Sequence, residues 1–164
     1  MIKRIQKLLV LIVVAATLTG CGSGRTAETR MIKQVTDGVE GQSNEIRVRN
    51  LLIVKNELSE GILVGTLVNW SDEVDAITGI SINNLPTTVS SSRLELRKNK
   101  PVIFAGESAN ADAAAVITQS IGQRIPVIIT FEKAAPITLD ALIVENVEWY
   151  KDLLRYQPSA VVTP

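Results

Sequence analysis

The sequence predicts an all-β, Greek-key β-sandwich of about eight strands, preceded by a short leader and a flexible tether. Three observations favour this class. From Ile46 onward, β-branched residues gather in short runs, turn residues separate these runs, and helical spacing is nearly absent. A chain of 164 residues is long enough to bury one core around such a domain.

Residues 1–20 are predicted to be a lipoprotein signal peptide. A basic start precedes an apolar run of 11 residues at 8–18, whereas a membrane-spanning helix needs about 20 residues. The motif that follows resembles the bacterial lipobox and comprises Leu18, Thr19, Gly20 and Cys21. By that resemblance, Cys21 becomes the acylated first residue of the mature chain. Because two acyl chains give stable attachment, we expect the protein at the cell membrane, anchored in its lipid and facing the extracytoplasmic side.

Residues 21–44 are predicted to form the lipidated cysteine and a flexible tether, because small polar and charged residues dominate and apolar residues are scattered. Cleavage of the leader would remove three basic side chains, so acidic groups would outnumber basic ones in the mature chain. That balance disfavours nucleic acid as a partner. The single cysteine also excludes an intrachain disulfide.

The predicted sandwich domain spans residues 45–148. Ile46 and Val48 alternate with Arg47 and Arg49, which places both arginines on an outer face, and 51–54 continues as a buried stretch. Residues 62–68 predict a central strand, in which Gly65 indicates a bulge or a close backbone approach. Six further strands are predicted at 76–82, 93–97, 102–104, 113–118, 125–131 and 137–147. Residues 149–164 are the predicted C-terminal tail.

The composition excludes several chemistries. The chain has no histidine, so it cannot build a Ser-His-Asp or Cys-His mechanism or a histidine-ligated metal site. The densest acidic cluster is Asp72, Glu73 and Asp75, but a calcium loop needs more ligands at defined offsets, so we interpret these as solvated turn acids. We expect no enzyme activity and no cofactor. An accessory hydrolase with two carboxylates across a cleft stays as an alternative.

Large amphipathic side chains and outward arginines are the candidate partner-binding residues. Trp70 lies in a predicted loop beside charged residues, and two interpretations stay open for it, packing at the edge of the core and anchoring of a protein partner. The same packing interpretation applies to Trp149 and Tyr150. Arg47, Arg49, Arg93 and Arg97 form either a solvated face or, if they cluster, a surface for an acidic partner or anionic head group.

Five short stretches together carry a resemblance to a known family. They are residues 37–39 (DGV), 46–50 (IRVRN), 65–69 (GTLVN), 75–80 (DAITGI) and 122–132 (GQRIPVIITFE). In this combination they resemble the lipoprotein branch of the PCuAC-type periplasmic copper chaperones, over roughly residues 37–148. The resemblance implies a cupredoxin-like β-sandwich that holds Cu(I) at one end with methionine and histidine and delivers it to respiratory oxidase assembly.

The chain departs from that family at the metal ligands. It has no histidine, and its two methionines are Met1, in the leader, and Met31, in the tether. The resemblance places the ligands in two segments, 82–92 and 109–117. The first holds Asn, Thr and Ser, and the second is rich in Ala. We therefore expect no metal site and a non-enzymatic binding or assembly module with a protein partner at the cell envelope. Copper delivery through an unrecognised or shared site is the alternative.

Overall fold

The structure is a computed structural model that describes residues 37–147, 150, 151, 153, 155 and 156. All of these belong to one compact unit, Thr36–Pro164. The predicted signal peptide, the lipobox with Cys21, most of the tether, Trp149 and residues 157–164 lie outside the described residues. Within the part that is described, no helix is long and apolar enough to cross a membrane.

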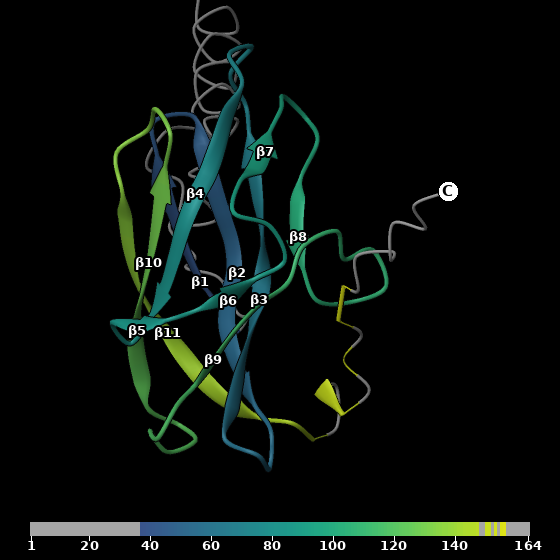
Figure 1. The fold of residues 1–164 in the computed structure, drawn as a ribbon, viewed down its shortest axis with the longest axis vertical. Coiled ribbons are helices and arrows are strands. Elements are labelled where there is room, and N and C mark those ends of the chain that lie inside the picture. Colours follow the sequence, from purple (N-terminus) through teal and green to yellow (C-terminus); the bar gives the residue numbers. More distant parts are fainter. Residues whose placement is uncertain (1–36, 148–149, 152, 154, 157–164) are drawn as a thin grey trace, which may run out of the picture. The chain divides into compact units, whose positions relative to one another are not determined.

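The described part of the chain is built from strands, which confirms the all-β sandwich (Figure 1). There are eleven strands rather than about eight among the described residues. In chain order they are β1 (Val39–Ser43), β2 (Ile46–Lys55), β3 (Glu60–Asn69), β4 (Asp75–Ile82), β5 (Leu85–Pro86), β6 (Thr88–Val89), β7 (Leu94–Leu96), β8 (Val102–Phe104), β9 (Ala113–Val116), β10 (Arg124–Phe131) and β11 (Ile137–Glu145).

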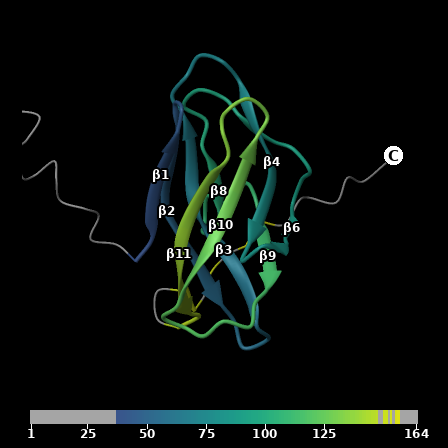
Figure 2. The same cartoon turned by 90° about the vertical axis from the view of Figure 1, so that its left-hand side faces the viewer.

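The strands form two layers that share β11. One layer contains β2 and β3 at its centre, with β1 on β2, β8 and β9 on β3, and β6 on β9. The other contains β5, β4 and β10, with β7 on β4. The first part of β11 pairs with β10 in an antiparallel manner and its last three residues pair with β2 in parallel, so β11 closes one side of the sandwich (Figure 2).

The core lies between the two layers and follows the alternation of the strands. Ile46 and Val48 of β2 are buried in it, as predicted, together with Leu63 and Leu67 of β3. Val127 and Ile129 of β10 face them from the other layer and are fully buried. Complete burial of each such side chain contributes about 1.5–3 kcal/mol, so this alternation is the main source of the sandwich's stability.

A bulge in β2 reverses which residues of that strand face the core. The register with β3 shifts between Arg49 and Leu52, and Asn50 has a positive φ of 50°. After the shift Leu51 and Ile53 join the core. Gly65 lies opposite, where a Cβ atom would come within 3.0 Å of Leu51 Cδ1 and 3.2 Å of Leu51 Cα. The prediction of a close backbone approach at Gly65 is confirmed.

Three of the observed strands were not predicted. β1 lies within the segment expected to be tether, so the sandwich begins before residue 45. Its pairing with β2 brings Gly41 against Ile137 and Leu139, where the absence of a side chain allows close packing. β5 and β6 have two residues each. β5 returns along β4 through Asn83 and Asn84, both at positive φ, as a type I′ hairpin turn requires.

Candidate functional site

Trp70 lies on the surface in the loop between β3 and β4. This loop is at the upper end of the sandwich in Figure 1. The β2–β3 register places Val68 opposite Arg47, so Trp70, two residues further on, is the diagonal neighbour of Arg47 on the outer face. The Arg47 Cζ atom lies 4.1 Å from the centroid of the Trp70 ring, a cation–π contact. The structure thus brings together two of the three predicted partner-binding residues.

The loop that carries Trp70 is fixed by the buried amide of Asn69. Its Nδ2 donates to the carbonyl oxygens of Glu73 at 2.7 Å and Leu96 at 2.9 Å, and its Oδ1 accepts from the Ser71 N–H at 2.8 Å. The Trp70 N–H donates to the Glu45 carbonyl at 3.1 Å. Because the backbone is held on both sides, the Trp70 ring projects outward and 52% of the residue is exposed.

Arg47 has unused hydrogen-bonding capacity. Its Nε is buried without a hydrogen-bond partner among the described residues, and no ion pair of Arg47 occurs among them. Arg49, the third candidate, points to the same outer face but pairs with Glu40 of β1 at 2.5 Å. Of these two arginines, only Arg47 has no ion pair with a described residue, and its guanidinium lies over the Trp70 ring.

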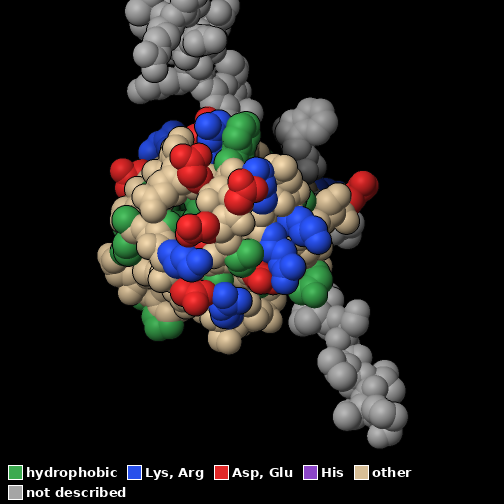
Figure 3. All heavy atoms as spheres, turned by 90° about the horizontal axis from the view of Figure 1, so that it is seen from above, with side chains coloured by type: hydrophobic (Ala, Val, Ile, Leu, Met, Phe, Trp, Pro, Cys, Tyr) green, Lys and Arg blue, Asp and Glu red, His purple; other side chains and the backbone are tan. Residues whose placement is uncertain are grey.

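The outward arginines do not form a single patch. Arg47 and Arg49 belong to β2, whereas Arg93 and Arg97 flank β7 in the other layer and pair with Glu132 and Glu95. At the end of the sandwich seen in Figure 3, Lys and Arg side chains are interspersed with Asp and Glu. This face therefore lacks the extended basic area that an anionic surface would need.

The three acidic residues after Trp70 have different environments. Asp72 pairs with Lys98 at 2.7 Å and Glu73 is exposed, as expected for solvated turn acids. For Asp75 the interpretation as a solvated turn acid is wrong. Asp75 is buried at the start of β4, and its carboxylate accepts hydrogen bonds from the N–H groups of Ala76, Lys133 and Ala134. Burial raises the pKa of Asp75, but the backbone hydrogen bonds outweigh burial and hold the pKa below its ordinary value. Asp75 is a structural carboxylate.

The two segments to which the resemblance assigns copper ligands lie side by side. β6, in the first segment, pairs with β9, in the second, and the Ser90 N–H donates to the Asp112 carbonyl at 2.9 Å. The side chains of both segments are hydroxyl, amide, carboxylate and aliphatic groups, and none is a soft sulfur or imidazole donor of the kind that Cu(I) prefers. Within the described residues, no group of three or more His, Cys, Asp or Glu side chains is placed to hold a metal ion.

An arginine from beyond β11 occupies one edge of this region. Arg155 Nε donates to Asp112 Oδ1 at 2.9 Å, Nη2 to Asp112 Oδ2 at 2.5 Å, and Nη1 to Glu60 Oε1 at 2.9 Å. The hydrogen bond to Asp112 is the main reason that the pKa of Arg155 is raised. Sequence reasoning missed this cluster, because its members are separated by 43 and 95 residues. The one feature of the sequence that could have pointed to this cluster is Asp112, a single carboxylate in an alanine-rich stretch.

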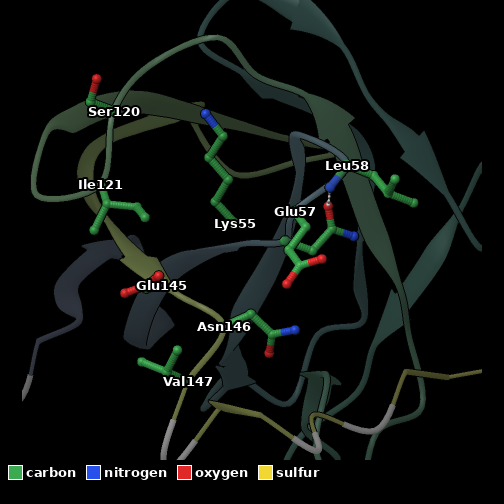
Figure 4. Close-up of a pocket in the computed structure, with 9 residues that line it drawn as sticks. Lys55, Glu57, Leu58, Ser120, Ile121, Glu145, Asn146 and Val147 are labelled. Atoms are coloured by element: carbon green, nitrogen blue, oxygen red, sulfur yellow. Dashed lines mark hydrogen bonds between the residues drawn. The ribbon is translucent and has the colours of Figure 1, made fainter.

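A hollow of about 580 Å³ opens at the other end of the sandwich. The β2–β3 turn, the loop before β10 and the end of β11 contribute its lining, including Leu58, Ile121 and Val147 (Figure 4). Lys55 Nζ donates a hydrogen bond to the Gln119 carbonyl oxygen at 2.8 Å. Glu57 and Glu145 also line the hollow, but both are exposed to solvent.

The comparisons with solved structures support the cupredoxin-like fold. The copper-bound PCuAC domain from PmoF2 matches with a TM-score of 0.57 at 18% identity, covering 65% of this chain and 98% of that domain. The apo PmoF2 domain matches with a TM-score of 0.58 at 17% identity, over 67% of this chain and 98% of that domain. The apo PCuAC domain from PmoF1 gives 0.57 at 14%, over 65% and 99%. No family model and no curated protein matches the sequence.

Proposed function

We propose that this chain is a membrane-anchored extracytoplasmic lipoprotein whose PCuAC-like sandwich is a non-enzymatic binding or assembly module without a Cu(I) site of its own. The acylated Cys21 is its anchor, and Trp70 with Arg47 is its contact with a protein partner at the cell envelope. One observation carries the proposal. β6 and β9 adjoin at the position to which the resemblance assigns the ligands, but that position presents no soft donor.

The Trp70 surface is the part of the sandwich best suited to a protein partner. A large aromatic side chain on a fixed backbone loses little conformational freedom on binding, and Trp and Arg are the residues that most often dominate binding energies. The Arg47 guanidinium is held by the ring and has no carboxylate among the described residues. A carboxylate on the partner would complete that hydrogen bonding.

The anchor proposal rests on the order of the leader features. A basic start, an apolar run too short to span a bilayer and the motif ending at Cys21 follow each other in the sequence. Metabolic labelling with a fatty acid tests this part directly. We expect label on the wild-type chain and none on a Cys21→Ser variant, and label on both would refute the anchor.

Affinity capture from the native membrane tests the binding part. The tethered protein is compared with Trp70→Ala and with Leu58→Ala, a matched control that removes another exposed apolar side chain, one with 86% exposure. We expect Trp70→Ala to lose a partner that the wild type and Leu58→Ala both retain. Recovery of the same partners by all three would refute the role of Trp70.

Copper delivery is the second candidate, because solved PCuAC domains share this fold and one of them is copper-bound. Here it would require an unrecognised site in the sandwich, sulfur from outside the described residues, or ligands from a partner, since Cys21, Met1 and Met31 are the only sulfur-bearing residues of the chain. Copper binding by a sandwich stripped of these donors would favour this candidate over the binding module.

A further inference from the structure

Among the described residues after β11, one side chain makes all the hydrogen bonds to the sandwich. We call the described residues 150, 151, 153, 155 and 156 the C-terminal segment. Within the described residues, every hydrogen bond from this segment to the strands comes from the Arg155 guanidinium. The segment's backbone bonds are local, from the Tyr150 N–H to Val147 and from the Leu153 N–H to Tyr150.

The two carboxylates that receive Arg155 are fixed by the strands. The backbone of Asp112 is held by Ser90, whose Oγ accepts the Asp112 N–H at 3.0 Å. Glu60 is held by Asn56, whose Nδ2 donates to Glu60 Oε2 at 3.1 Å and whose Oδ1 accepts the Glu60 N–H at 2.9 Å. The side chain of Asp112 is only 13% exposed. Neighbouring side chains thus hold the backbones of both acidic residues, and the two carboxylates together receive one guanidinium.

An apolar surface adjoins this receptor on the outer face of the β2–β3–β9 layer. After the bulge, Leu52 and Val54 point away from the core but are fully buried. The strand register places Val54 opposite Ile62, which shares a face of β3 with Glu60 and alternates with Leu63, and Ile62 pairs with Ala114. Tyr150, Leu153 and Tyr156 of the C-terminal segment are half-buried.

The C-terminal segment reaches this side of the sandwich at Arg155, which pairs with Glu60 of β3 and with Asp112 before β9. Burial is the main cause that raises the pKa of Tyr150, and the negative charge of Asp37 adds to it. The segment is an occupant with aromatic and apolar side chains and one arginine.

We propose that this outer face is a binding surface for an extended peptide segment that carries an arginine among apolar side chains, and that the C-terminal segment covers it until a partner's segment displaces it. The bidentate pairing selects arginine over lysine, because only a planar guanidinium reaches both oxygens of Asp112. The surface lies on strands, whereas the described residues of its occupant hydrogen-bond to it through Arg155 alone. The proposal depends neither on the Trp70 surface nor on the absence of copper.

The test uses the purified full-length protein and two labelled peptides, YKDLLRY, which reproduces residues 150–156, and YKDLLQY. Binding is measured by fluorescence anisotropy. An intramolecular occupant competes with the added peptide, so Arg155→Gln protein should bind YKDLLRY at least about tenfold more tightly than wild type does. The Arg155→Gln protein should bind YKDLLQY at least about tenfold more weakly than it binds YKDLLRY. In the double variant Arg155→Gln/Asp112→Asn, the two peptides should bind equally.

Two further variants keep the result interpretable. Arg124→Gln removes another arginine, one that donates only to the Asp140 carbonyl, and should match wild type. If Arg155→Gln fails to fold, Arg155→Lys retains the charge and loses the bidentate pairing, so it should bind YKDLLRY with an affinity between those expected for wild type and Arg155→Gln. Equal binding of both peptides by the folded Arg155 variant, or binding no tighter than wild type, would overturn the proposal.

Discussion

Arg47 and Trp70 form a cation–π pair on the outer face, with Cζ 4.1 Å from the ring centroid. The pair arises from the β2–β3 register and from Asn69, which fixes the loop after β3. Trp70 thus contributes to the fold as well as to the proposed binding surface, and the two contributions can be separated by measurement.

Trp70→Ala should lower the free energy of unfolding by about 1 kcal/mol, because it removes the stacked ring and its contact with Arg47. In a double-mutant cycle with Arg47→Ala, the coupling between the two residues should be about 0.5–1 kcal/mol. Urea unfolding followed by circular dichroism gives all four values. Leu58→Ala, which removes an exposed side chain outside the pair, serves as the control and should change stability little. A coupling indistinguishable from zero would argue against a stable pair.

Asp75 should make stability fall in acid. Its folded-state pKa lies below the unfolded value, so the stabilisation is present above about pH 4 and is lost as the pH falls through the folded pKa. Asp75→Asn should cost about 1.5–3 kcal/mol at neutral pH, because the charged acceptor of three backbone N–H groups is lost. Unfolding measured from neutral pH into acid should show the stability difference between the two proteins shrinking as the pH falls through the folded pKa of Asp75. A constant difference would contradict the assignment.

Asn69 should be essential to the loop that presents Trp70. Asn69→Ala leaves the buried Leu96 carbonyl without its donor, at a cost of about 1–3 kcal/mol. The loss should also increase solvent quenching of Trp70 fluorescence, measured in a Trp149→Phe background so that one indole reports. Asn146→Ala, beside the hollow at the other end of the sandwich, is the matched control and should leave the Trp70 signal unchanged. Unchanged quenching in Asn69→Ala would show that the loop is held by other contacts.

The fold class could be predicted because the long strands carry their own pattern. Ile46 and Val48 alternate with arginines, and the apolar stretches of β3 and β10 identify strands from neighbouring residues alone. β1 lacks this pattern, and β5 and β6 have two residues each, so they exist only through pairing with distant strands. Their sequences contain too little periodicity to predict.

The site could be predicted only where its residues are close in the chain. Trp70 and its arginine were both candidates, but their contact depends on a register that the sequence does not specify. Asp75 looked like a turn acid because its hydrogen-bond donors at Lys133 and Ala134 are 58 and 59 residues away. Arg155 and Asp112 share no local spacing, so their pairing became visible only in the folded chain.

Titration with Cu(I) against a competing chelator tests the central claim most directly. The protein to use is the chain from residue 21 onward with Cys21→Ser and Met31→Leu, which removes the two sulfur-bearing residues of the mature chain, so any tight site must use donors other than sulfur and imidazole. We predict no one-to-one binding at sub-micromolar affinity. One-to-one sub-micromolar binding by this variant would contradict the account, because it would show that the sandwich holds copper with donors other than sulfur and imidazole.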